Sequence, residues 1–292
     1  MSEYLKMDST KAEVTVKRLQ NISQLPAIPK VITEVSKLFS NPNTSITQLS
    51  DIIEKDQALT LKVLSVANSP LYGIQREINS LHAAILILGF QELRSIVTAL
   101  GMKMSFKTTS SEYFDFHEFW LHSMVVGIAA KRITKELGFH FDGDSFTAGI
   151  LHDFGLLVLH EYLQDSYEKI LLHATENNMD ILEAEYEILG LSHQEIGNFL
   201  AKKWSLTSTL NDSLTFHHRP AESLKNNYLT SIIHIADYAT QKLQIGNFFW
   251  DNNYKLDSSV LSLLNFVTRE EFEDFIEAYR EDFALTASTV KL

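Results

Sequence analysis

The most apolar stretch of the chain, residues 146–163, carries two titratable side chains at its centre, His152 and Asp153. Burying such groups is costly unless a metal, an ion pair or hydrogen bonds compensate for the lost water. A fold that buries this stretch must therefore bring partners to the pair or leave the pair at a surface. The rest of the sequence should contain residues that can converge on it.

Apolar residues recur at helical spacing along the whole chain, and no segment shows the alternation that is typical of a β-strand. We therefore predict an all-α fold of two packed helical lobes, the second of which is a helical bundle. The expected units are an N-terminal extension over 1–20, a first lobe over 21–110 and a second lobe over 111–292. The boundary is placed in the polar stretch 107–111, where the composition shifts.

Caps and chain breaks predict where the helices begin and end. Thr44 or Ser45 can cap one helix, Asp56 the next, and Ser80 a short buried helix that Gly89 stops. The stretch 146–163 is predicted to be one continuous helix, and so is 268–286. The remaining helices are predicted at about 10–24, 30–39, 46–55, 57–67, 91–106, 113–137, 164–177, 179–189, 192–204, 207–218 and 226–242.

The composition disfavours several classes of protein. The net charge is −12, and Lys and Arg are scattered, so a basic face for nucleic acid is not expected. The absence of cysteine excludes disulfides and thiolate metal sites. The first residues do not resemble a signal peptide, and no apolar run approaches the ~20 residues of a membrane span. We expect a cytoplasmic protein, with its oligomeric state open.

Histidine is the informative residue type, with eleven in the chain. A single histidine in such a chain is more often a satisfied core residue or a surface residue than a ligand. Five histidines and two aspartates, however, project from apolar helices that can pack around one centre. Imidazole and carboxylate suit first-row divalent metals, and helical bundles build such sites from facing helices. The seven residues are His122, His152, Asp153, His193, His217, His218 and Asp237.

The order of these seven residues resembles the HD superfamily of metal-dependent phosphohydrolases. The segment His193–Leu200 and the later pair of histidines are similar to the branch that contains the HD-GYP cyclic-di-GMP phosphodiesterases. Further motifs across residues 20–240 resemble the HDOD family, the HD-related output domain. These motifs are Leu25-Pro26 with Pro29, Asp56-Gln57-Ala58-Leu59, Ala67-Asn68-Ser69-Pro70, Ser80 through Gly89, Gly149 through Gly155, and His217-His218-Arg219-Pro220.

The resemblance implies a bacterial signalling role as an output or adaptor module, without an established enzymatic activity. Many members have lost HD ligand positions, whereas each position that can be aligned is filled here. The resemblance also implies one or two divalent ions, with Fe, Mn, Ni, Zn and Mg all open. One ion would be held by His122, His152, Asp153 and Asp237, and Asp153 would bridge to a second held also by His193, His217 and His218.

Two departures from the HD-GYP enzymes bear on catalysis. Leu156 stands where those enzymes have a lysine, and Arg219 begins the segment Arg-Pro-Ala-Glu in place of a DGxGYP loop. In the enzymes, these missing groups contact the phosphates of cyclic-di-GMP and the reacting water. Hydrolysis of cyclic-di-GMP is therefore disfavoured for this chain.

Two classes of function stay open. The favoured one is a regulatory module that acts through a signalling protein partner or through a phosphorylated or nucleotide ligand. The alternative is a metal-dependent phosphohydrolase or phosphodiesterase, in which His152 and Asp153 would be catalytic through a metal-activated water. A third reading of the seven residues alone is a polar cluster that stabilises the bundle.

Two neighbouring features also have alternative interpretations. His234 lies one turn before Asp237 and either orients a ligand or is a satisfied core histidine. Phe248, Phe249 and Trp250 form an apolar loop that either contacts a partner or folds back onto the core.

Overall fold

The computed structural model describes residues 9–22, 29–39, 41–68, 77–106, 110–141, 144–246, 250 and 254–289. Helices account for the regular structure of these residues, and their one β-type contact is an isolated bridge between Ser111 and Phe114. The prediction of an all-α fold is therefore confirmed. None of the described helices is both long and apolar enough to cross a bilayer.

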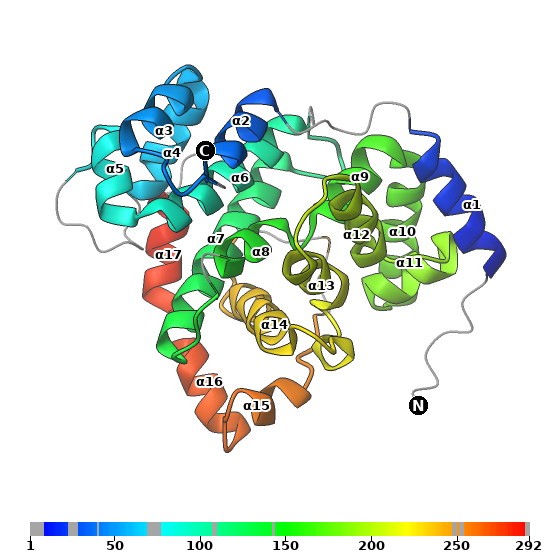
Figure 1. Cartoon of the computed structure of the whole chain (residues 1–292). Coiled ribbons are helices and arrows are strands. Elements are labelled where there is room, and N and C mark those ends of the chain that lie inside the picture. Colours follow the sequence, from blue (N-terminus) through cyan, green and yellow to red (C-terminus); the bar gives the residue numbers. More distant parts are fainter. Residues whose placement is uncertain are drawn as a thin grey trace.

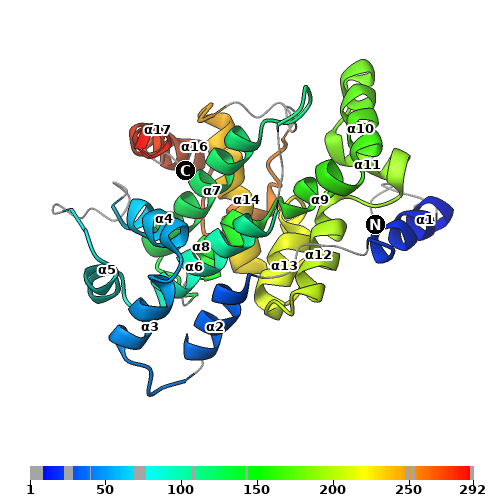
Figure 2. The same ribbon diagram turned by 90° about the horizontal axis from the view of Figure 1, so that it is seen from above.

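The first group of helices gathers on one side of the molecule (Figures 1 and 2). It consists of α2 (Lys30–Phe39), α3 (Ile46–Ile53), α4 (Gln57–Ala67), α5 (Leu81–Leu88) and α6 (Phe90–Ser105). The caps follow the sequence prediction, because Ser45, Asp56 and Ser80 each accept a hydrogen bond from a backbone N–H in the first turn of the helix that follows. The expectation that α5 is buried is wrong for its outer face, where Leu86 and Ile87 are exposed.

The second group is built around α7, which runs through the middle of the molecule with α8 and α14 packed against it (Figure 1). Its helices are α7 (Phe116–Glu136), α8 (Asp144–Leu151), α9 (Phe154–Tyr162), α10 (Gln164–Asn177), α11 (Ile181–Leu189), α12 (His193–Lys203), α13 (Ser208–Phe216) and α14 (Asn227–Lys242), with the 3-10 turn η2 (Pro220–Glu222). These bounds lie within a few residues of the predicted ones, except at the centre of the stretch 146–163.

The C-terminal segment differs from its prediction. A short helix that was not predicted, α15 (Ser259–Leu263), precedes α16 (Arg269–Glu277) and α17 (Arg280–Thr289). The single helix predicted over 268–286 is thus wrong, because the chain turns at residues 278–279. The turn directs α17 back against α7, where Tyr279 and Phe283 are buried and their rings stack with centroids 5.0 Å apart.

The first helix, α1 (Ser9–Gln20), contacts residues that are far from it in the sequence. It packs beside α10 and α11 (Figures 1 and 2). Thr15 Oγ1 donates to the carbonyl of Leu189 at 2.8 Å, and Arg18 donates to Ser166 Oγ at 3.1 Å. The predicted N-terminal extension therefore contacts the second group of helices. The predicted domain boundaries stay a prediction.

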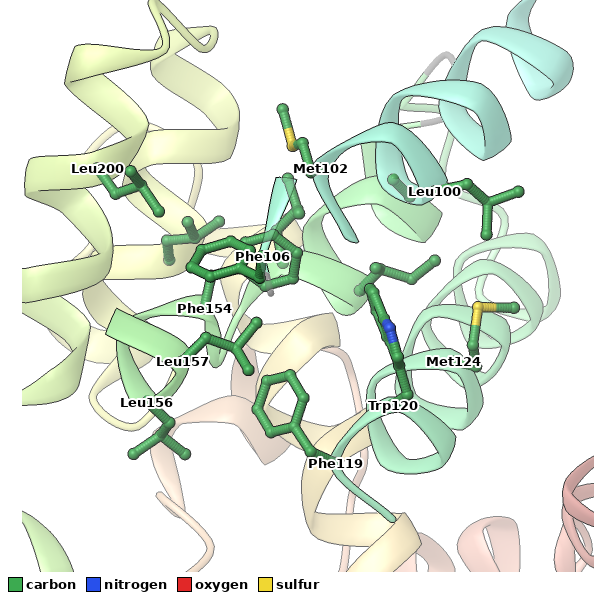
Figure 3. Close-up of a cluster of buried hydrophobic side chains, with 14 of the residues drawn as sticks. Leu100, Met102, Phe106, Phe119, Trp120, Met124, Phe154, Leu156, Leu157 and Leu200 are labelled. Atoms are coloured by element: carbon green, nitrogen blue, oxygen red, sulfur yellow. The ribbon is translucent and has the colours of Figure 1, made fainter. Parts of the chain in front are cut away.

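A continuous aromatic core joins the two groups of helices (Figure 3). Phe106, at the end of α6, lies edge-on to Phe154 of α9 at 5.6 Å and to Trp204 after α12 at 6.0 Å. Trp120 of α7 meets Phe154 at 6.0 Å. Burying large aromatic rings is strongly stabilising, so this core fixes α6, α7, α9 and α12 relative to one another.

Candidate metal centre

The predicted central helix is interrupted at the pair that drew attention in the sequence. Helix α8 ends at Leu151 and α9 begins at Phe154, with His152 and Asp153 in the turn between them. The prediction of one helix is wrong, and the reason is geometric. Neighbouring side chains on a continuous helix project about 100° apart, so they cannot both face one centre. The turn lets them do so, with His152 Nε2 at 3.2 Å from Asp153 Oδ2.

The start of α12 is held against α9 by a glycine. A Cβ atom at Gly155 would lie 1.8 Å from the carbonyl oxygen of His193, so only glycine allows this backbone approach. The approach places His193, the first residue of α12, beside the turn. Its Nε2 lies 3.4 Å from Asp153 Oδ1.

The structure brings all seven sequence-predicted residues together in two adjoining groups. The donor atoms within each group lie within 4.8 Å of one another. One group is His122 of α7, His152 and Asp237 of α14, and the other is Asp153, His193, His217 and His218. Six of the seven are buried, and His218 is partly exposed.

Asp153 lies between the two groups and its two oxygens face different ones. Oδ2 is 3.2 Å from His152 Nε2 and 3.6 Å from His122 Nε2. Oδ1 is 3.3 Å from His217 Nε2 and 3.4 Å from His193 Nε2. The second carboxylate, Asp237, places Oδ1 at 3.2 Å from His122 Nε2. Two carboxylates thus neutralise the centre of a cluster of five imidazoles.

Backbone carbonyls fix the protonation of two of the rings. His152 Nδ1 lies 2.6 Å from the carbonyl of Gly149, and His217 Nδ1 lies 2.9 Å from the carbonyl of Leu214. A carbonyl oxygen can only accept, so each Nδ1 carries the proton and donates it. In the neutral ring Nε2 then presents a lone pair, and it points into the cluster.

Glu185 fixes a third ring, and it is the functional residue that sequence reasoning missed. It is fully buried on α11 and accepts from the backbone N–H of His193 at 2.9 Å. Its two oxygens also lie 3.0 and 2.9 Å from His193 Nδ1. The sequence signal was present, because Glu185 falls on the buried face of α11 with Ile181, Ala184 and Leu189. A carboxylate behind a ligating imidazole orients the ring and raises its basicity.

The electrostatics of the cluster favour positive charge at its centre. Burial alone would lower the pKa of His122, but hydrogen bonds to Asp153 and Asp237 raise it to about 9. Burial likewise opposes charge on His193, yet Glu185 and Asp153 raise its pKa well above the ordinary value. Burial would raise the pKa of Asp153, but His152 and the other neighbouring histidines lower it well below the usual range. Asp153 therefore stays a carboxylate.

The imidazoles of the cluster approach one another closely enough to share a proton or a cation. The Nε2 atoms of His193 and His217 lie 3.3 Å apart, and those of His122 and His152 also lie 3.3 Å apart. Burial lowers the pKa of His217 to about 4, so this ring is neutral. Facing lone pairs repel unless a proton or a cation lies between them. Nitrogen and carboxylate donors at this spacing suit a first-row divalent metal.

Comparison with known proteins places the chain in a family. A family model of the HDOD domain matches residues 25–220. The chain belongs to the HDOD family. Among curated proteins it is 23% identical over 198 residues to an uncharacterised protein of Treponema pallidum (strain Nichols). The match covers 68% of this chain and 38% of that relative, so the chain spans less than half of the relative's length.

Solved structures share the fold over nearly the whole HDOD chain. An HDOD domain protein of unknown function from Geobacter sulfurreducens is 24% identical, with a TM-score of 0.78 over 96% of this chain and 97% of that one. A candidate phosphohydrolase from Shewanella amazonensis SB2B is 23% identical, with a TM-score of 0.73 and coverage of 96% and 99%. A candidate signal transduction protein from Marinobacter aquaeolei VT8 is 18% identical, with a TM-score of 0.75 and coverage of 99% and 67%. At these identities the likeness shows the fold alone.

His234 lies next to the cluster and hydrogen-bonds to the segment that bears two of its histidines. Its Nε2 accepts from the backbone N–H of Asp257 at 2.8 Å, so Nδ1 carries the proton and donates to the carbonyl of His217 at 2.7 Å. The hydroxyl of Tyr254 lies 2.8 Å from the same Nδ1. His234 is thus a satisfied core histidine that also holds the segment bearing His217 and His218 in place. The interpretation as a satisfied core histidine is confirmed, and the alternative that it orients a ligand stays a prediction.

Buried apolar side chains surround the cluster. Trp250 is buried, with its ring centroid 5.9 Å from that of His122 and 5.9 Å from that of Phe119. This part of the apolar loop folds back onto the core, whereas Phe248 and Phe249 lie outside the described residues. Leu156 is 2% exposed and belongs to the hydrophobic core, so the helix turn after Asp153 offers no charge.

Proposed function

We propose that this HDOD protein is a regulatory module whose second group of helices is organised around a divalent metal centre, and that it acts by binding a partner protein or a small ligand. The observation that carries the proposal is the position of Asp153. Its two oxygens face two separate groups of buried donors. A divalent cation between the two groups would compensate the burial of these donors.

The donor geometry supports a particular assignment of ligands. His122, His152, Asp237 and Oδ2 of Asp153 would hold one ion. Oδ1 of Asp153 with His193, His217 and His218 would hold the second. Five imidazoles among seven ligands favour Fe, Ni or Zn over Mg and Mn, because Mg and Mn prefer oxygen donors. These residues lie in the middle of α7, at the start of α12, at the end of α13 and within α14. The ions would therefore tie these helices together.

The surroundings of the cluster support regulation rather than turnover. Six of the seven residues are buried and only His218 reaches solvent in part. Leu156, buried in the core, replaces the lysine that the resembling enzymes carry one turn after the His-Asp pair. A phosphoester would therefore find most of the cluster closed to solvent. It would also lack the positive charge of that lysine.

A phosphohydrolase is the second candidate, and one observation favours it. All seven candidate ligands come together, and Asp153 turns one oxygen toward each group, which supports a bridge between two ions. Divalent ions at such a site supply Lewis-acid activation of water and charge to hold phosphoryl oxygens. His152 and Asp153 would then be the residues on which hydrolysis depends.

Metal content tests the proposal. The protein is purified without chelator, and its metal is measured by elemental analysis for the wild type, Asp153→Ala and Asp212→Ala. Asp212 of α13 is a matched control, since its carboxylate accepts from Ser223 and Asn226 and is not part of the cluster. We expect one or two ions per chain in the wild type and in Asp212→Ala, and a loss in Asp153→Ala. A wild type that binds no divalent metal overturns both candidate functions.

A substrate screen separates the two candidates. The metal-containing wild-type protein is incubated with phosphomonoesters, phosphodiesters and cyclic dinucleotides, and their hydrolysis is measured. The regulatory module predicts no turnover. Turnover that disappears in Asp153→Ala and persists in Asp212→Ala establishes the phosphohydrolase instead.

A further inference from the structure

A second site candidate lies away from the metal cluster. A cavity of about 300 Å³ is lined by α2 and α6 of the first group of helices, by α8, and by the turn between α12 and α13. It shares no residue with the cluster. Its volume reaches the lower end of the range for small-molecule sites, about 300–1,000 Å³.

The wall between α2 and α6 is formed by close packing. A Cβ atom at Gly101 of α6 would lie 2.0 Å from Cγ1 of Ile32 on α2, so the two helices touch at this point. Ile32 is 2% exposed and lines the cavity. The cavity is therefore preformed by packed helices, as ligand sites generally are.

The lining combines one positive charge with an aromatic ring and hydroxyl groups. Arg94 is the one cationic side chain among the lining residues, in a chain with a net charge of −12. Thr98 and Thr147 add hydroxyl groups, Trp204 adds an indole ring, and Asp144 adds a carboxylate. An arginine binds phosphate or carboxylate groups. An indole can pack against a flat aromatic ring. A carboxylate can accept hydrogen bonds from N–H groups on that ring. The chemistry matches a small organic anion with an aromatic ring.

Three of the elements that reach this cavity also reach the metal cluster at their other ends. Helix α8 begins at Asp144 in the cavity and ends one residue before His152. Helix α12 begins at His193 and is followed by Trp204 in the cavity. These helices have 8 and 11 residues, so they connect the two places over about 12–17 Å.

Helix α13 makes the third connection. Thr207, which lines the cavity, caps its first turn by accepting from the N–H of Leu210 at 3.3 Å. His217 caps its other end. A ligand that shifts the cavity ends of α8, α12 and α13 must move residues of the cluster, because short packed helices move as rigid elements.

We propose that this cavity is the regulatory ligand site of the protein and that it takes a small organic anion bearing an aromatic ring, of the size of a mononucleotide. Arg94 binds the acidic group and Trp204 contacts the ring. Occupancy changes the geometry of the metal cluster through the three helices. The coupling rests on the proposed metal-holding function, whereas the binding site itself does not.

Calorimetry with whole and truncated probes tests the site. The probes are guanosine 5′-monophosphate and adenosine 5′-monophosphate, with guanosine and ribose 5-phosphate as the two halves. We expect one nucleotide per chain, bound about tenfold or more tightly than either half. If neither nucleotide binds the wild type at millimolar concentration, the proposal is overturned.

Charge variants locate the binding. Arg94 is exposed at the cavity mouth, so Arg94→Gln is expected to fold normally and to weaken nucleotide binding about tenfold or more. Lys37→Gln removes an equal charge from an exposed position of α2 that does not line the cavity, and it should bind as the wild type does. Equal binding by Arg94→Gln and the wild type overturns the proposal.

Metal release measures the coupling. The rate at which a chelator removes metal is followed with and without the bound nucleotide, and we expect a several-fold change in the wild type and none in Arg94→Gln. A wild type that binds nucleotide but no metal contradicts the proposed function and leaves the site standing, whereas metal without nucleotide binding contradicts the site alone.

Discussion

The two groups of helices solve the problem of burial in opposite ways. Over the described residues 30–106, the buried polar side chains are only Ser50, Ser95 and Lys103. Lys103 lies over the ring of Trp120 at 4.6 Å, and burial lowers its pKa to about 7. Over residues 110–246, by contrast, the core encloses a cluster of histidines, aspartates and Glu185.

The difference predicts two sources of stability. The first group rests on apolar burial and helix caps, which need no ligand. The second group buries charges that are compensated only by one another and, in our proposal, by metal. Perturbations at the cluster should therefore loosen α9, α12 and α13 first, and perturbations in α2–α5 should leave metal binding unchanged.

The largest effect is expected from Asp153→Ala. It removes the carboxylate that faces both groups of donors and leaves buried imidazoles without their central partner. We expect a loss of about 3–5 kcal/mol in the free energy of unfolding. Chemical denaturation measures the loss, and hydrogen exchange should show it in α9, α12 and α13 rather than in α3 and α4. Equal loss of protection in both groups of helices would contradict separate sources of stability.

A core truncation in the first group should have a comparable but slightly smaller effect. Leu59 of α4 is fully buried, so Leu59→Ala leaves a cavity and should cost about 2–5 kcal/mol. Metal content should stay at the wild-type value, since α4 carries no cluster residue. Loss of metal in folded Leu59→Ala would show that the two groups are not independent.

Glu185→Gln should act on the metal without breaking the fold. The amide still fits the site but no longer accepts as an anion from His193 Nδ1. We expect metal affinity to fall about 10- to 100-fold, as measured by competition with a chelator. Glu183→Gln, on the partly exposed side of the same helix, is the control and should bind metal normally. Equal affinities for the two variants contradict the role of Glu185.

The smallest effect is expected at a cap in the first group. Ser45 and Gln48 form a capping box at the start of α3. Ser45→Ala should lower the free energy of unfolding by about 1 kcal/mol and leave metal affinity unchanged. Denaturation and chelator competition measure the two quantities. A change in metal affinity would again link the two groups.

Much of this architecture could be predicted from the sequence because local signals fix it. Ser45, Asp56 and Ser80 cap their helices as predicted, since capping depends on residues three positions apart. The seven residues of the cluster could be named because polar side chains at buried helical positions need partners. Their convergence is seen in the structure, and their role as ligands stays a proposal.

The rest depended on contacts between distant parts of the chain. The turn at residues 152–153 has no proline or glycine within it and apolar residues on both sides, so helical periodicity runs through it unbroken. The turn at residues 278–279 is similar, because it is set by packing of α17 against α7. Glu185 was missed because its partner, His193, lies on the following helix. Local patterns do not report such contacts.

The central claim is that the cluster around Asp153 holds divalent metal. Anomalous X-ray diffraction from crystals of the protein, grown without chelator and measured at the absorption edge of the metal found by elemental analysis, tests it most directly. The account predicts one or two anomalous peaks, each within bonding distance of an oxygen of Asp153 and of the histidines facing that oxygen. Crystals with no anomalous peak among the seven residues would contradict it.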